Sequence, residues 1–140
     1  GVLELSNSDD SYVASKDVWD MSLSSGFTIS FWLKVNVNEE TMTGRETIAS
    51  YQITGQSGLC EIALVNPRDL TLVVHGRLNS NIEFGENSGL DLTDGKWHFV
   101  AVTWRSAGGE VNFFDNGVLV WEGGPLQADY SVQSGGSWVI

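Results

Sequence analysis

Apolar and polar residues alternate with a period of two along most of the chain, which indicates β-strands rather than helices. The alternation is longest in "GFTISFWLKVNV", residues 26–37. One face of this stretch carries the apolar residues Phe27, Ile29, Phe31, Leu33 and Val35. A helix would scatter these five side chains around its circumference, so the pattern predicts one strand of about ten residues.

Shorter stretches of the same kind follow, separated by turn clusters that are rich in glycine, asparagine and serine. They lie at residues 46–53, 60–65, 70–76, 80–84, 96–104, 110–115 and 117–123, and "SGGSWVI" (134–140) begins like another strand. Asn116-Gly117 predicts a two-residue hairpin with a type I′ turn. Since no stretch with helical periodicity lies between these strands, the fold class is all-β: an antiparallel two-sheet sandwich or jelly roll.

The stretch 97–104 differs from the others because both of its faces are apolar. Trp97, Phe99 and Ala101 fall on one face, and Val100, Val102 and Trp104 on the other. Such a strand should be central and covered on both sides. We therefore expect Phe31, Trp97, Phe99 and Trp104 to belong to the structural core, and His98 to be a hydrogen-bonded structural histidine.

Length and charge limit the classes of partner. The 140 residues predict a single domain, 1–140, and 18 acidic against 7 basic residues give a net charge of −11. This charge excludes nucleic acid and an anionic membrane surface as favoured partners. It suits calcium or a basic partner, although plain solubility explains it as well. No apolar run approaches the ~20 residues that span a bilayer.

The groups that could support catalysis are few. The chain has two histidines and no G-x-S-x-G motif. His75 ends an apolar stretch beside a turn, where we expect an exposed side chain. Glu61 is a single carboxylate within a strand, and Glu110 and Asp115 stand at opposite ends of another. The sequence therefore predicts that the domain is not an enzyme.

Three stretches together resemble the laminin-G/pentraxin superfamily, and most closely its pentraxin-type branch. They are "GFTISFWLKV", "DGKWHFVAVTWRSAGGEVNFFDNG" and the closing "GGSWVI". The resemblance implies a concanavalin A-like jelly roll that is secreted or part of an ectodomain. It places Ser30 and Ala101 where pentraxins carry a disulfide, and Leu59 and Cys60 where they carry an Asp-Asn pair that binds calcium. Neither the bridge nor that half of the calcium site is therefore present.

The end of the chain bears on the same comparison. Ile140 follows a strand-like stretch without a polar tail, and an apolar edge there would be left unpaired. The acidic loop that completes the calcium site in pentraxins would fall beyond Ile140. We therefore expect the fold to be C-terminally incomplete in this chain, and the domain to be part of a longer protein or excised from one.

Other residues are weaker candidates for a ligand site. Asp9 and Asp10, in "SNSDDS", offer oxygens that suit calcium, or form a solvated turn. Trp19 lies outside the alternating stretches and would stack on a sugar ring or cap an edge of the sandwich. Cys60, the one cysteine, is either a small buried hydrophobe or a thiol that bridges to another chain.

These observations lead to a hypothesis about function. We expect a non-catalytic extracellular recognition or assembly module that mediates protein–protein adhesion or builds a scaffold, with other protein domains or glycans as partners and oligomer or fibre assembly as one outcome. The alternative is a calcium-assisted, lectin-like domain that binds glycans.

Overall fold

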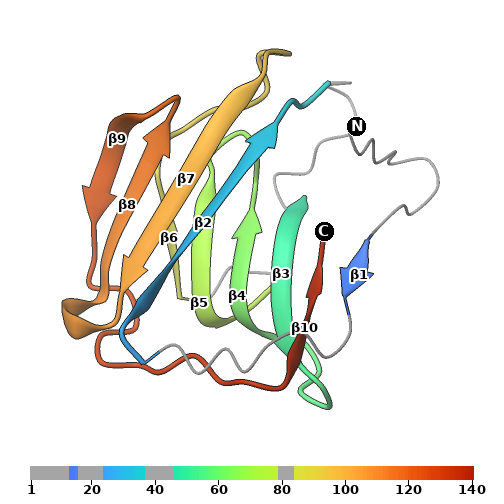
Figure 1. Cartoon of the computed structure of the whole chain (residues 1–140), viewed down its shortest axis with the longest axis vertical. Coiled ribbons are helices and arrows are strands. Elements are labelled where there is room, and N and C mark those ends of the chain that lie inside the picture. Colours follow the sequence, from blue (N-terminus) through green and yellow to red (C-terminus); the bar gives the residue numbers. More distant parts are fainter. Residues whose placement is uncertain (1–12, 16–23, 37–45, 79–83) are drawn as a thin grey trace.

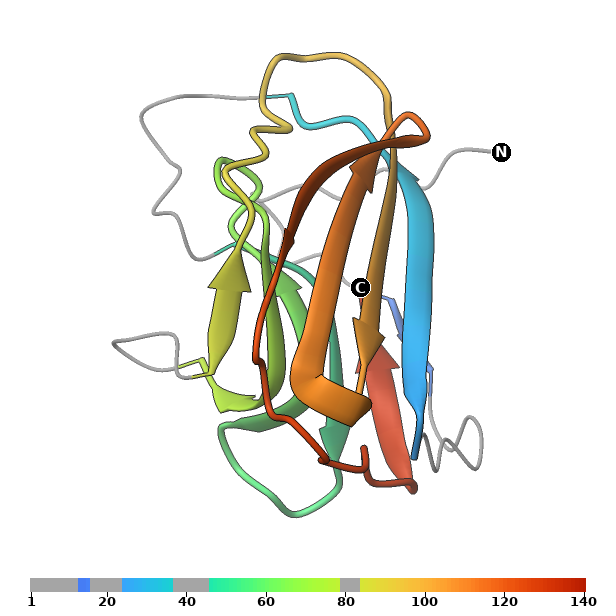
Figure 2. The same cartoon turned by 90° about the vertical axis from the view of Figure 1, so that its left-hand side faces the viewer.

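A computed structural model describes residues 13–15, 24–36, 46–78 and 84–140 of the chain. They form two antiparallel β-sheets that pack face to face (Figures 1 and 2). Within the described ranges, helical structure is confined to a short 3-10 turn, Ala107–Gly109. The prediction of an all-β, two-sheet sandwich is confirmed.

The larger sheet has six strands in the order β1-β10-β3-β4-β5-β6. Their bounds are β1 Ala14–Ser15, β3 Thr47–Ile53, β4 Leu59–Val65, β5 Thr71–Arg77, β6 Gly85–Asn87 and β10 Gly136–Val139. The strand predicted at 134–140 is thus present as β10, where it pairs with β1 on one side and with β3 on the other. Most of the strand predicted at 80–84 lies outside the described residues, and β6 follows it.

The smaller sheet has four strands in the order β2-β7-β8-β9. Their bounds are β2 Gly26–Leu33, β7 His98–Arg105, β8 Glu110–Asp115 and β9 Val118–Gly123. β2 pairs with β7 in one continuous register, in which Ser30 lies directly opposite Ala101. The two positions that the pentraxin resemblance gives to a disulfide are therefore neighbours in this structure.

The hydrophobic core fills the space between the two sheets. It draws on alternate residues of strands from both sheets, including Tyr51, Ile62, Leu64, Leu72, Val100, Val102, Trp104 and Phe113. Trp104 is 2% exposed, its ring stacks on Phe27 at 5.3 Å, and its Nε1 donates a 2.8 Å hydrogen bond to the backbone oxygen of Leu126. This bond ties the segment after β9 to the core and satisfies the indole N–H.

β7 is central in its sheet, as predicted, but it is covered on one side. Val100 and Val102 are fully buried against the core, whereas Phe99, Ala101 and Thr103 point to the outer face and are half-buried. The prediction that both faces are covered was wrong. Apolar residues at successive positions show that both faces of a strand are apolar, but they do not show whether a second layer packs on each.

The β8–β9 hairpin turns through Asn116 and Gly117, which have φ angles of 50° and 83°. Positive φ at both central residues is what a type I′ turn requires, and Asn-Gly is the pair that adopts it most readily. The predicted turn is confirmed.

Candidate binding surface

The outer face of the four-stranded sheet carries an exposed apolar group of side chains. We call Trp32, Phe99, Phe114 and Leu119 the outer platform. Trp32 is 62% exposed and its ring lies 5.3 Å from that of its register partner Phe99. Phe114 and Leu119 are direct partners on β8 and β9, and Ala101 is the β7 partner of Phe114. The platform therefore crosses all four strands on one face.

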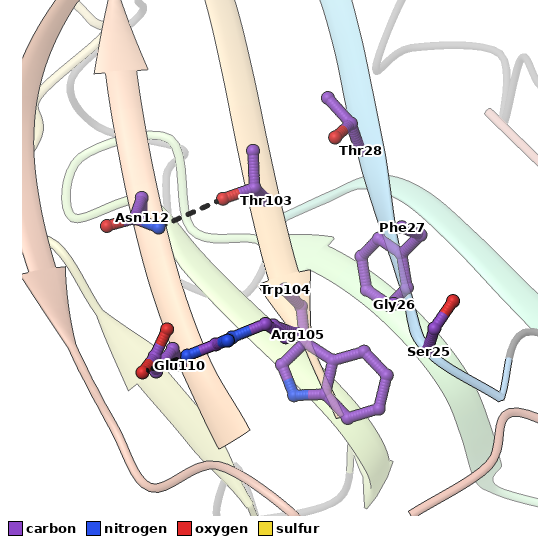
Figure 3. Close-up of a pocket in the computed structure, with 9 residues that line it drawn as sticks. All are labelled: Ser25, Gly26, Phe27, Thr28, Thr103, Trp104, Arg105, Glu110 and Asn112. Atoms are coloured by element: carbon purple, nitrogen blue, oxygen red, sulfur yellow. Dashed lines mark hydrogen bonds and ion pairs between the residues drawn. The ribbon is translucent and has the colours of Figure 1, made fainter. Parts of the chain in front are cut away.

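The same face becomes polar towards the other end of the strands. Thr28, Thr103 and Asn112 are successive register partners across β2, β7 and β8, and Asn112 Nδ2 donates a 3.2 Å hydrogen bond to Thr103 Oγ1. Next to this row Arg105 forms an ion pair with Glu110, both side chains being more than half exposed. Figure 3 shows these groups around a shallow, open depression. Such a surface suits contact with another macromolecule better than enclosure of a small molecule.

A buried carboxylate lies at one end of the sandwich, away from this face. Glu61 is 1% exposed, and its oxygens contact Nδ1 of His75 at 2.9 Å, the hydroxyl of Tyr130 at 2.7 Å and the backbone N–H of Gln133 at 2.9 Å. The Tyr130 hydroxyl also lies 2.7 Å from His75 Nδ1. Burial, followed by the bond to Glu61, raises the pKa of Tyr130. These bonds join β4, β5 and the segment before β10, so the cluster serves to hold three parts of the chain together.

Sequence reasoning missed this cluster and expected an exposed His75. The imidazole is instead half-buried, its ring centre lies 4.4 Å from that of Tyr130, and its backbone has a positive φ of 47°. A left-handed residue interrupts the alternation of a strand, so the period-two pattern does not report which way the side chain points. The signal in the sequence that could have predicted this cluster was a single glutamate, Glu61, inside an otherwise apolar strand, since a buried carboxylate needs hydrogen-bond partners.

His98 is a hydrogen-bonded structural histidine, as predicted. It is 8% exposed, and its two ring nitrogens lie 3.0 Å from oxygens of Asp94 and Asp115. The bond to Asp94 is the main cause that raises the pKa of His98. In turn, hydrogen bonds from His98 and Lys96 hold the pKa of Asp94 well below its ordinary range. The cluster fixes the start of β7 against the β8–β9 hairpin.

The positions where pentraxins bind calcium do not fit that ion here. Leu59 offers no side-chain oxygen, and Cys60 is a buried thiol that accepts a 3.2 Å hydrogen bond from Gln52. Within the described ranges no group of three or more His, Cys, Asp or Glu side chains is arranged to hold a metal ion. Asp9, Asp10 and Trp19 lie outside the described residues.

Cys60 is 1% exposed, on the side of the six-stranded sheet away from the core, beside Ala63, Val65 and Val73. Burial raises the pKa of its thiol. Both observations fit a small buried hydrophobe better than a thiol that bridges to another chain.

The four expected core residues divide between the core and the surface. Trp104 lies in the core, and Phe31 packs against it. Phe99 belongs to the outer platform. Trp97 is 47% exposed, so its assignment to the core was wrong. β7 begins only at His98, because Asp94 Oδ1 accepts a hydrogen bond from the backbone N–H of Lys96, which keeps the residues before His98 in a turn.

Two antiparallel sheets around a hydrophobic core make the domain an all-β sandwich, and the sequence comparison identifies its family. The model of the Laminin G 3 family, described as the concanavalin A-like lectin/glucanases superfamily, matches residues 7–140. The chain belongs to this family. It is also 29% identical over 118 residues to neuronal pentraxin-2 of guinea pig (Cavia porcellus) and to that of human. The matches cover 81% of this chain and 24% of each relative, so the chain spans about a quarter of their length.

Solved structures show the same fold at low sequence identity. A native heptameric SAP-like pentraxin from Limulus polyphemus matches with a TM-score of 0.59 and 16% identity, over 84% of this chain and 52% of that one. The full extracellular region of zebrafish Gpr126/Adgrg6 matches with a TM-score of 0.58 and 16% identity, over 96% of this chain and 16% of that one. The binding domain of botulinum neurotoxin DC, in complex with rat synaptotagmin II, matches with a TM-score of 0.54 and 18% identity, over 84% of this chain and 28% of that one.

Together the family and its relatives confirm the laminin-G/pentraxin resemblance. In the part of the chain that the structure describes, no helix is both long enough and apolar enough to cross a membrane.

Proposed function

We propose that this domain is a non-catalytic recognition and assembly module of an extracellular protein, and that it binds other proteins through the outer face of the four-stranded sheet. The observation that carries the proposal is the outer platform. A tryptophan that is 62% exposed and in contact with a phenylalanine ring has been left in water over a sheet that buries its other face. Exposed tryptophan with neighbouring apolar area marks interaction sites, where it supplies much of the binding energy.

The shape of this face favours a protein over a sugar. The platform spreads across four strands, and the neighbouring depression is shallow and open. Flat surfaces with an apolar centre and a polar rim are the usual anatomy of protein interfaces. Here the rim includes the Thr28–Thr103–Asn112 row and the Arg105–Glu110 ion pair.

The relatives support the same proposal. One structural neighbour is the extracellular region of Gpr126/Adgrg6, one is a heptameric pentraxin, and one is a binding domain in complex with synaptotagmin II. Extracellular location, assembly and binding of a protein are thus all found among proteins of this fold.

The test compares two substitutions of exposed tryptophan. Trp32→Ala removes the centre of the outer platform, and Trp97→Ala removes a 47% exposed tryptophan outside it. The purified domain and both variants are applied to an array of purified ectodomain proteins and to a glycan array, with and without calcium. We expect protein partners that the wild type and Trp97→Ala retain and that Trp32→Ala loses by about tenfold or more.

Two results would overturn the proposal. Protein partners that Trp32→Ala retains in full would show that the platform is not the binding face. Glycan binding that needs calcium, with no protein partner, would instead establish the lectin-like alternative.

A further inference from the structure

β9 forms one edge of the four-stranded sheet and is unusually apolar for an exposed edge (Figures 1 and 2). Val118, Leu119 and Val120 are 63%, 46% and 43% exposed. An exposed edge strand is a template for pairing with another chain, and proteins usually protect it with lysine or proline. Residues 118–123 contain neither, and the bulge in this strand, at Val120, lies beyond Leu119.

The hairpin geometry identifies which backbone groups are free at this edge. In a two-residue hairpin the closing pair, here Asp115 and Val118, exchanges backbone hydrogen bonds. Because successive residues of a strand turn their backbone groups to opposite sides, the N–H and C=O of Leu119 point away from β8. They are available to a further strand.

Charge identifies the kind of strand that would pair there. Carboxylates flank the apolar edge: Glu122 is exposed near one end, and Asp115, at the hairpin end, stays partly exposed beside its bond to His98. Nearby cations are engaged by acidic neighbours, since Arg105 pairs with Glu110 and Lys96 with Asp94. With a net charge of −11 on the chain, the edge favours a basic partner and opposes a second copy of the same chain.

We propose that β9 is a docking edge for an extended segment of a partner protein, in which small apolar residues are flanked by lysine or arginine. The segment adds a fifth strand to the sheet next to β9. Its backbone bonds to Leu119, its apolar side chains cover Val118, Leu119 and Val120, and its basic residues face Glu122 and Asp115. This proposal rests on the proposed protein-binding function and names the class of partner.

The test uses a synthetic peptide with alternating valine and threonine between terminal arginines. Two controls accompany it: the same peptide N-methylated at the amides that would pair, and a version with glutamate in place of arginine. Binding is followed by NMR of the domain's backbone amides and by hydrogen exchange. We expect binding of the arginine peptide, slower exchange of the Leu119 amide, and weaker binding at high salt. The N-methylated peptide should bind about tenfold more weakly, because it loses backbone hydrogen bonds.

Two variants address the same edge from the protein's side. Leu119→Pro removes the outward N–H and should reduce peptide binding about tenfold, whereas Leu119→Ile keeps both that N–H and an apolar side chain of the same size and should bind within about threefold of the wild type. If the proline variant fails to fold, the N-methylated peptide still tests the same bond.

Three results would overturn the proposal: equal binding of the N-methylated peptide, no binding of the arginine peptide, or a dimer of the domain alone by analytical ultracentrifugation. The protein-binding function itself is tested separately, by the loss of array partners in Trp32→Ala.

Discussion

Ser30 and Ala101 lie opposite each other on β2 and β7, and the double substitution Ser30→Cys with Ala101→Cys should restore the disulfide that the resemblance to pentraxins places there. Direct partners in an antiparallel pair have Cα atoms about 4.5–5.5 Å apart, which is within the range that a disulfide spans. Both side chains point to the outer face, where Ser30 is exposed and Ala101 half-buried, so the two sulfurs have room.

The size of the effect follows from the loop that the bridge closes, from residue 30 to residue 101. For a loop of this length the chain-entropy relation gives about 4 kcal/mol of stabilisation. In a domain of this size each kcal/mol raises Tm by about 2–4 °C, so the upper expectation is a rise of about 8–16 °C. Strain reduces the stabilisation that many engineered bridges give, and we therefore expect a rise in Tm of at least about 4 °C, half of the lower figure.

The assay is thermal unfolding of the oxidised double variant, of the same protein in reductant, and of the single variant Ser30→Cys. Oxidation should raise Tm in the double variant alone, and thiol titration of the folded protein should find no reactive group, since Cys60 is buried. The reasoning fails if the two new cysteines do not pair under mild oxidant, or if oxidation raises Tm by less than about 4 °C.

Three further predictions concern single side chains. Glu61→Gln should lower the free energy of unfolding by about 2–4 kcal/mol in urea titration, because three donors lose a buried carboxylate. The surface control Glu122→Gln should change this free energy by less than about 0.5 kcal/mol, and equal effects of the two substitutions would contradict the role of burial. Since the pKa of His98 is raised in the folded state, the stability that the charged imidazole contributes is complete below the unfolded-state pKa of about 6.5 and is lost as pH rises through the folded-state pKa. The difference in the free energy of unfolding between wild type and His98→Gln should therefore shrink from pH 6 to pH 9, and a difference that grows would refute this sign. Gly117→Ala should cost about 1 kcal/mol, because φ is 83° and no neighbour lies near the added methyl group; a neutral effect would show that the turn relaxes.

Local pattern was sufficient for much of the fold. The alternation in 26–37 predicted β2, and Asn116-Gly117 predicted the turn between β8 and β9, because both signals depend on residues that are close in sequence. The two faces of β7 were also predicted. Whether another layer covers each face of β7 depends on how the whole chain packs, and the spacing of apolar residues within one strand does not show this.

The site was less accessible to sequence reasoning for the same physical reason. The alternation in 26–37 puts Trp32 opposite the apolar face, but its 62% exposure and its contact with Phe99 depend on a register with β7 that is set far along the chain. The Glu61 cluster joins residues 61, 75, 130 and 133, and one of them has a left-handed backbone that breaks the alternation. Trp97 was predicted to be buried and is exposed. Its position continues the apolar pattern of β7, but the strand begins only at His98, because the hydrogen bond from Lys96 N–H to the Asp94 side chain keeps the preceding residues in a turn.

The pairing of β2 with β7 also has a consequence for synthesis on the ribosome. The partners of β2 lie 65 to 79 positions downstream, from Leu33–His98 to Gly26–Arg105. Because the chain is made from its N-terminus, β2 leaves the exit tunnel well before any strand that it pairs with has been made, and loop closure over such distances then slows folding further. For that interval Phe27, Ile29, Phe31 and Leu33 have no sheet to join, whereas β7, β8 and β9 emerge together as a local meander. We therefore expect the apolar face of β2 to stay unpaired on the nascent chain until β7 has been made, and synonymous codons that slow translation between β2 and β7 to lengthen that exposure.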